Sequence, residues 1–277
     1  MAQKLPRKKN TLPLLGGLGA SLVLMYTLGN CARGASTSES EESGGDTIDV
    51  ALEYSPLSFY QYDDTLGGYN YDLLRLLARD HGIIFKYHPV TAVSKPLEKI
   101  ASGKYDLLVA DVPTTTELKE HYNLLEPVLL DKQVLVQRKD KNGEVKIKSQ
   151  LDLAGDTLWV VNGSSIEGRI NNLAKEIGSD IHVKHEDEYG AEQLFIMTSL
   201  GEINNAVVNE RVARELAKEY PNVDISTNIS FTQFQSWITG KDRVELADSI
   251  NKWLVDLKKT DEYQKLVEKY FPKEDIK

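Results

Sequence analysis

Short apolar runs alternate with helix-spaced apolar residues along the first half of the chain after residue 47. Ile48–Tyr54, Ile84–Val90 and Tyr105–Ala110 have the length of strands. The last of these shows no clear polar alternation, which is typical of a strand covered on both faces. Tyr69–Asp80 carries apolar residues at helical spacing, and Val93–Ser102 predicts a second helix. This β-α-β-α-β order indicates a doubly wound α/β sheet.

A second series of strands and helices follows. Val128–Arg138 predicts a long strand leading out of the first series. The pattern then predicts strands at Thr157–Val161, Ile181–Lys184, Asn205–Val208 and Val223–Ser226, and helices at Ile166–Ile177, Ala191–Leu200 and Glu210–Glu219. Phe231–Thr239 is expected to return to the first series, before closing amphipathic helices at Lys241–Lys258 and Asp261–Tyr270.

Polar turns follow predicted strands in both series. Thr114–Thr116 comes after the buried run ending at Ala110, and Asn162–Ser165 comes after Val161. Ligands of open α/β sheets bind beyond the carboxyl ends of the strands, where helix N-termini offer unpaired N–H groups. We therefore expect two lobes that face each other across a cleft lined by these turns.

Composition and charge are those of a soluble globular protein. Of the 277 residues, 27% are charged and 41% hydrophobic. The formal net charge of −9 argues against a nucleic-acid partner, because a protein that binds phosphates needs a basic face. The single cysteine excludes an intrachain disulfide bond.

The amino terminus has the pattern of an export signal over residues 1–31. Basic residues come first, and the segment Thr11–Leu28 that follows has no charged residue. Its length is about the minimum for a helix that spans a bilayer. The ending at Cys31 is similar to a bacterial lipoprotein signal, in which the cysteine is lipidated, although Asn30 departs from the usual small residue. The alternative is an uncleaved signal anchor. Both place the globular part outside the cytoplasmic membrane. Residues 32–46, rich in Ser, Glu and Gly, predict a disordered tether.

Several segments together resemble a known family. They are Tyr54–Phe59, Gly68–Leu73, Leu97–Asp106, Glu126-Pro127, Leu151–Gly155, Gly163–Ser165 and Glu268–Phe271. In order and spacing they resemble the family 3 extracellular solute-binding proteins, of the periplasmic amino-acid-binding type, over roughly Thr47–Pro272. The second half also resembles the binding domain of membrane-bound lytic transglycosylase F, notably at Val161–Ser165.

The resemblance implies a two-lobed, type II periplasmic-binding-protein-like fold. Its lobes would comprise residues 47–137 with 234–277, and residues 138–233, joined by crossover strands near Val136–Lys139 and Phe231–Phe234. Each lobe would be a doubly wound sheet. The ligand would bind between the lobes, which close about a hinge.

Three positions depart from the family's pattern for free α-amino acids. Leu118 stands where the family has an arginine that binds the ligand carboxylate through two hydrogen bonds, a geometry suited to a guanidinium group. Pro113 stands where a threonine would contact the ligand, and it has neither a hydroxyl nor an N–H to offer. Asn209 stands where a carboxylate would pair with the ligand ammonium. We predict that the protein does not bind free α-amino acids in the standard way.

The expected ligand site combines aromatic walls with hydroxyls and amides. In the first lobe it comprises Tyr54, Phe59, Asp111 and Thr115, and in the second lobe Gly163, Ser164, Ser165 and Asn209. Such a lining suits a neutral polar ligand or a peptide fragment. The alternatives are that the aromatic residues belong to the core and that the hydroxyls and Asn209 only cap helices.

The sequence offers little catalytic chemistry. No carboxylate pair stands out, no cofactor is predicted, and His182 and His185 fit a charged edge better than a metal site. The leading hypothesis is a non-enzymatic, monomeric, membrane-tethered solute-binding protein that serves an ABC permease or a sensor. The second is a cell-wall module that binds muropeptides or a partner enzyme. The third is a dehydratase-like enzyme on the same fold, which would need an acid/base pair in the cleft.

Overall fold

The computed structural model describes residues 47–271, and its first sheet has six strands. Three are parallel: β4 (Ile84–Val90), β1 (Thr47–Glu53) and β5 (Leu107–Pro113). Three run antiparallel to them or to each other: β13 (Gln233–Gly240), β6 (Tyr122–Leu124) and β7 (Leu129–Asp131). The order is β4-β1-β5-β13-β6, with β7 also paired to β13. The predictions for residues 1–31 and 32–46, including Cys31, lie outside the described residues.

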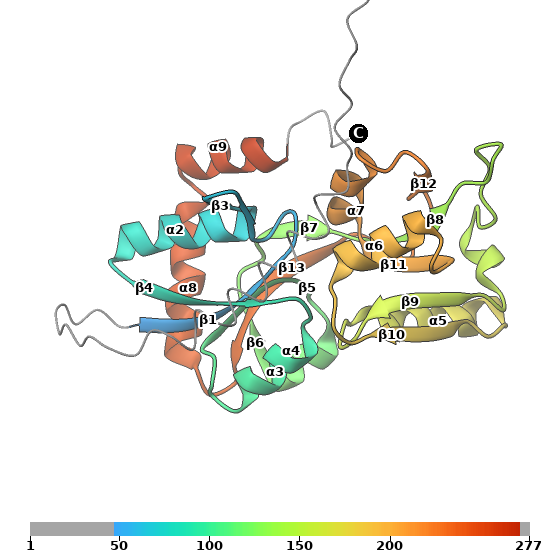
Figure 1. Ribbon diagram of the computed structural model, residues 1–277. Coiled ribbons are helices and arrows are strands. Elements are labelled where there is room, and N and C mark those ends of the chain that lie inside the picture. The colour runs from blue at the N-terminus through green and yellow to red at the C-terminus, as the bar shows by residue number, and fades with distance from the viewer. Residues whose placement is uncertain (1–46, 272–277) are drawn as a thin grey trace, which may run out of the picture. The chain divides into compact units, whose positions relative to one another are not determined.

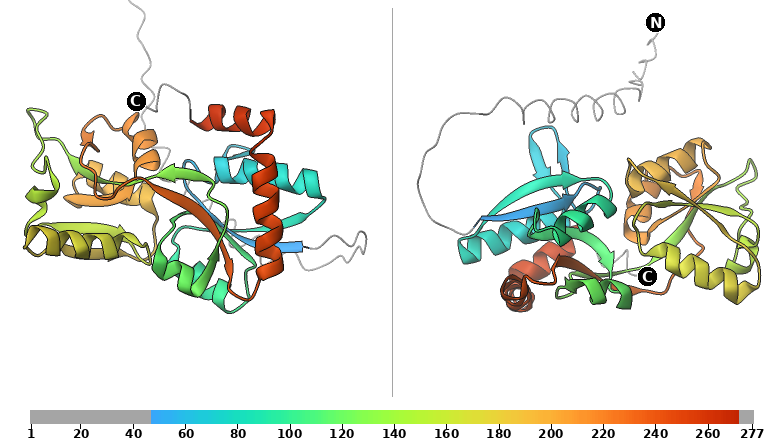
Figure 2. Two further views of the ribbon diagram at one scale, coloured as in Figure 1. Left: turned by 180° about the vertical axis from the view of Figure 1, so that it is seen from behind. Right: turned by 90° about the horizontal axis from the view of Figure 1, so that it is seen from below.

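Helices cover both faces of the first sheet (Figures 1 and 2). The helices α2 (Tyr69–His81) and α8 (Val244–Leu257) pack on one face, and α9 (Asp261–Tyr270) lies against α2. The helices α3 (Ser94–Ala101) and α4 (Thr116–His121) pack on the other face. This arrangement buries the strands on both sides, as their apolar character predicts.

The second sheet has five strands in the order β10-β9-β11-β8-β12. They are β10 (His182–Glu186), β9 (Thr157–Val161), β11 (Asn205–Asn209), β8 (Gln133–Arg138) and β12 (Val223–Asp224). The helix α5 (Ile166–Ile177) packs on one face, and α6 (Ala191–Leu200) and α7 (Glu210–Ala217) pack on the other. A short 3-10 helix, η1 (Gln150–Leu153), precedes β9. The two sheets confirm the α/β, doubly wound, two-lobed fold class.

The first passage of the chain between the sheets lies at a different place from that expected. Val128–Arg138 is two strands, because β7 ends at Asp131 in the first sheet and β8 begins at Gln133 in the second. The first crossing therefore lies at Lys132, ahead of Val136–Lys139. Asp131 and Gln133 are both buried, so no exposed polar stretch marks the change of sheet in the sequence. The return crossing lies between β12 and β13, close to its expected place.

A hairpin that the sequence pattern did not predict follows β1. It pairs β2 (Tyr60–Tyr62) with β3 (Thr65–Gly67). Gly68 then begins α2 with a φ of 125°, and a Cβ there would lie 2.3 Å from the Ser58 carbonyl oxygen. Only glycine fits so close a backbone approach. Among residues 47–271, no helix is long and apolar enough to cross a membrane.

Candidate functional site

The side chain of Asn70 ties the loop after β1 to β5 and β13. Asn70 is fully buried in α2, and its Nδ2 donates to Ser58 Oγ at 2.8 Å and to Asp111 Oδ1 at 3.0 Å. Its Oδ1 accepts from Trp237 Nε1 at 3.0 Å. Asn70 therefore positions the aromatic loop beside Asp111. Asn70 belongs to the family segment Gly68–Leu73, but its bonds to distant residues could not be predicted from that segment.

The two aromatic candidates have different environments. Phe59 is 7% exposed and packs in the main core, whereas Tyr54 is half-buried at its edge. Their rings meet edge to face with centroids 6.1 Å apart. Phe59 also contacts the ring of Tyr71 at 5.4 Å. Phe59 therefore fits the core alternative, and Tyr54 keeps the surface that a ligand contact needs.

The structure brings together two carboxyl groups that the sequence analysis did not recognise as a pair. Glu53 ends β1, and its Oε2 accepts the backbone N–H of Asp111 at 3.3 Å. Burial, followed by the charge of Asp111, raises the pKa of Glu53 to about 8. Burial also raises the pKa of Asp111, against the lowering effect of the hydrogen bond from Asn70. The expectation that no carboxylate pair stands out was wrong, because residues 53 and 111 are distant in sequence and adjacent only across paired strands.

The hydroxyls of Thr114 and Thr115 make hydrogen bonds within the first lobe. Thr115 Oγ1 accepts the backbone N–H of Leu118 at 3.2 Å and so caps α4. Thr114 Oγ1 lies 3.2 Å from Ser236 Oγ on β13. Leu118 packs against the apolar cluster under α3 and α4, and Pro113 is buried. The side chain of Thr115 therefore fits its capping alternative.

The glycine-serine turn of the second lobe meets the first lobe directly. Gly163 has a φ of 76°, and a Cβ there would lie 2.5 Å from Ser94 Cβ. Ser165 precedes α5 without a side-chain capping bond, and Ser164 Oγ is buried with no hydrogen-bond partner in the described part of the chain. The two hydroxyls therefore do not serve as helix caps, and Ser164 has unused hydrogen-bonding capacity.

Asn209 bridges the two lobes. Its Oδ1 accepts from Gln133 Nε2 at 3.1 Å, and its Nδ2 donates to the backbone oxygen of Asp111 at 3.4 Å. It makes no side-chain capping bond to α7, which excludes its capping alternative. The next residue, Glu210, supplies a carboxylate, but that group pairs with Lys132 at 3.4 Å and with Arg214 at 2.8 Å.

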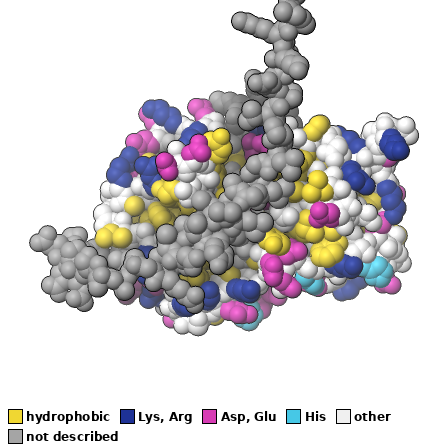
Figure 3. Space-filling view, in the orientation of Figure 1, with side chains coloured by type: hydrophobic (Ala, Val, Ile, Leu, Met, Phe, Trp, Pro, Cys, Tyr) yellow, Lys and Arg dark blue, Asp and Glu magenta, His cyan; other side chains and the backbone are white. Residues whose placement is uncertain are grey.

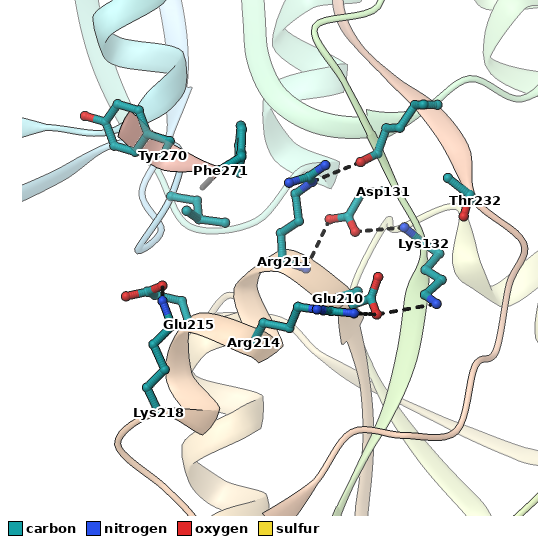
Figure 4. Close-up of a pocket in the computed structure, with 12 residues that line it drawn as sticks. Asp131, Lys132, Glu210, Arg211, Arg214, Glu215, Lys218, Thr232, Tyr270 and Phe271 are labelled. Carbon is teal, nitrogen blue, oxygen red and sulfur yellow. Dashed lines mark hydrogen bonds and ion pairs between the residues drawn. The ribbon is translucent and has the colours of Figure 1, made fainter. Parts of the chain in front are cut away.

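A pocket of about 380 Å³ lies beside α7, between elements of both lobes (Figure 4). None of the eight predicted ligand-binding residues lines it. On the face shown in Figure 3, acidic and basic side chains of the described residues are interspersed. No group of three or more potential metal-ligating side chains occurs within residues 47–271.

Comparison with known proteins finds a family match over the whole of the described chain. The family "Bacterial extracellular solute-binding proteins, family 3" matches residues 47–273. The L-cystine-binding protein TcyJ of Escherichia coli is 25% identical over 262 residues, which cover 93% of this chain and 94% of that protein. An ancestral arginine-binding protein bound to arginine superposes with a TM-score of 0.71 at 27% identity, over 81% of this chain and 98% of that one.

Membrane-bound lytic murein transglycosylase F of Aeromonas hydrophila is 28% identical over 222 residues. The match covers 79% of this chain and 44% of that enzyme. The chain thus spans about half the length of the curated transglycosylases that it matches. The similar region is the binding domain, as the resemblance at Val161–Ser165 implies.

Proposed function

Because the chain belongs to the bacterial extracellular solute-binding proteins of family 3, we propose that it captures a small polar solute or a short peptide between its two lobes. The observation that carries the proposal is the buried hydroxyl of Ser164. It lies at the N-terminal end of α5, next to the point where Gly163 meets the first lobe, and no described residue satisfies it. A buried polar group without a partner costs free energy that a ligand hydrogen bond would recover.

The proposed ligand is not a free α-amino acid held in the standard way. Leu118 packs in an apolar cluster, and the carboxylate of Glu210 is already in ion pairs with two cations. The polar groups offered by Asp111, Asn209 and Ser164, beside the half-buried Tyr54, suit amides and hydroxyls. A peptide or another neutral polar compound supplies these groups.

A lipid on Cys31, or an uncleaved anchor, would hold the lobes outside the cytoplasmic membrane on the tether of residues 32–46. A monomer at that place would deliver its ligand to an ABC permease or report it to a sensor. The lobes would act by binding and not by catalysis.

A second candidate function is favoured by the similarity to transglycosylase F. The matched relatives are named as membrane-bound lytic murein transglycosylases, and their similarity covers most of this chain. In this alternative, the lobes bind muropeptides or regulate a cell-wall enzyme. The ligand would then be a peptide carrying sugar or a cell-wall stem peptide.

The carboxyl pair of Glu53 and Asp111 supplies two titratable groups close together, as the enzyme alternative requires, but both groups are buried. Asp111 Oδ1 accepts a hydrogen bond from Asn70, and Asn209 donates to the backbone oxygen of Asp111. We therefore propose that the pair affects the pH dependence of folding stability and does not take part in catalysis. Incubation of a bound ligand with the protein, followed by NMR, tests this: an unchanged ligand supports binding, and conversion that is lost in Glu53→Gln contradicts it.

Thermal-shift screening tests the proposed function. The compounds are free α-amino acids, short peptides and muropeptides, because a ligand raises the stability of the form that binds it. We expect peptides or muropeptides to raise the melting temperature, and the variant Ser164→Ala to reduce the rise. A large rise with ordinary free amino acids would contradict the interpretation of Leu118 and Asn209, and no rise with any class would contradict the function.

A further inference from the structure

The guanidinium group of Arg211 is held in a fixed orientation at the pocket beside α7. It lies 4.1 Å from the ring centroid of Phe271, and its Nε donates to the backbone oxygen of Leu130 at 2.9 Å. Its two terminal nitrogens make no hydrogen bond or ion pair with any residue of the described range 47–271. A planar fork that is stacked on an aromatic ring and held at Nε is well oriented to receive two oxygens of one carboxylate.

Within residues 47–271, the carboxyl group of Asp131 forms no ion pair with the terminal nitrogens of Arg211. Asp131 is 3% exposed, and its two oxygens accept backbone N–H groups, from Lys132 at 2.8 Å and from Arg211 itself at 3.4 Å. Burial raises the pKa of Asp131 to about 7. Asp131 meets Arg211 through the backbone N–H, which leaves the terminal nitrogens of the guanidinium available to a ligand.

The other charges of the pocket are largely balanced among themselves. Lys132 and Arg214 both pair with Glu210, and Lys218 pairs with Glu215 at 2.6 Å. Leu57, Leu130, Thr232, Tyr270 and Phe271 complete the lining. Figure 4 shows Arg211 between Phe271 and Asp131. The volume of about 380 Å³ is within the range of small-molecule sites.

We propose that this pocket is a second binding site, which takes a ligand bearing a carboxylate group through the fork of Arg211. The ring of Phe271 would keep the guanidinium in plane, and Lys132 would add positive charge at the opposite wall. The site is separate from the cleft of Tyr54, Ser164 and Asn209, and the proposal does not depend on what that cleft binds. Since both lobes line the pocket, an occupant would contact both at once.

Titration with a matched pair of probes, followed by ¹H–¹⁵N NMR, tests the proposal. The probes are acetyl-alanyl-alanine, which has a carboxylate and no ammonium, and its neutral C-terminal amide. We expect the acid to shift the signals of Arg211 and Lys132, and the amide to shift neither. Arg211→Lys keeps the charge but loses the fork, and should weaken binding by about tenfold or more. Arg75→Lys, on an exposed part of α2, is the control and should change nothing.

The chain itself contains carboxylates close to this site in sequence, at Glu274 and Asp275. The double variant Glu274→Gln/Asp275→Asn therefore distinguishes an external ligand from an internal one. Tighter binding of the acid by this variant than by the unchanged protein would identify the internal source and still support the site. Equal binding of acid and amide, unchanged affinity in Arg211→Lys, or shifts confined to Gly163–Ser165 would overturn the proposal, as would no binding to either protein.

Discussion

Asn70 uses one side chain to connect three elements of the first lobe. It accepts from Trp237 on β13 and donates to Ser58 in the loop after β1 and to Asp111 on β5. All of these groups are buried or nearly so, and therefore water cannot replace a lost bond without reorganisation. The amide of Asn70 thus fixes the aromatic loop relative to Asp111, which is the residue that Asn209 of the second lobe contacts.

We predict that Asn70→Ala lowers the free energy of unfolding by about 3 kcal/mol, because it leaves buried donors and acceptors unpaired. Urea denaturation followed by tryptophan fluorescence measures the change. Asn172→Ala, at an exposed position on α5, is the matched control and should stay close to the unchanged protein. A loss no larger than that of the control would show that the network does not hold the loop.

Glu53 predicts a pH dependence of stability with a definite sign. Its pKa in the folded protein, about 8, lies above the ordinary value of 4.5. Between these values the folded protein keeps a proton that the unfolded chain releases, so the free energy of unfolding falls as pH rises through that window. Urea denaturation at several pH values should show a smaller fall for Glu53→Gln than for the unchanged protein. The same dependence of stability on pH in Glu53→Gln and in the unchanged protein would contradict the assignment. The control is Glu120→Gln, at an exposed position, which we expect to follow the unchanged protein.

The turn between β9 and α5 brings the second lobe close to the first at Gly163. Gly163 and Gly155 share a φ of 76°, but only Gly163 has a neighbour, Ser94, where a Cβ would stand. Alanine strains the backbone equally at both positions. The contact with Ser94 is therefore the difference between the two substitutions.

We predict that Gly163→Ala opens the lobes and that Gly155→Ala does not. Small-angle X-ray scattering of residues 45–277, which form one compact unit, measures this as a larger radius of gyration for Gly163→Ala alone. The same radius for both variants would show that the contact with Ser94 does not limit closure.

Most strands and helices could be predicted from the sequence because each is marked by its own local pattern. Tyr105–Ala110 is apolar apart from Asp106, and β5 is buried there on both faces. The crossing at Lys132 could not be predicted, because buried residues continue on both sides of it. The roles of Asn70 and Glu53 depend on partners distant in sequence, which no local pattern shows. The loop at Tyr54 and the turn at Gly163 were predicted because polar turns after strands indicate ligand sites.

At the scale of the whole molecule, one apolar cluster extends from the first sheet into the second. It includes Leu52 and Trp237 of the first lobe together with Val136 and Phe195 of the second. Polar contacts between the lobes include those of Thr91 with Glu188, of Asp111 with Asn209 and of Arg211 with Leu130. A shared core with a polar meeting edge is suited to limited hinge motion about the two crossings.

Hydrogen–deuterium exchange with and without a compound selected by the thermal-shift screen tests this account most directly. A ligand held between the lobes should slow exchange in the loops of both, at 54–59 and 111–116 in the first and at 162–166 in the second. Protection confined to the loops of one lobe, or to α7 and the Arg211 pocket alone, would contradict capture between the lobes.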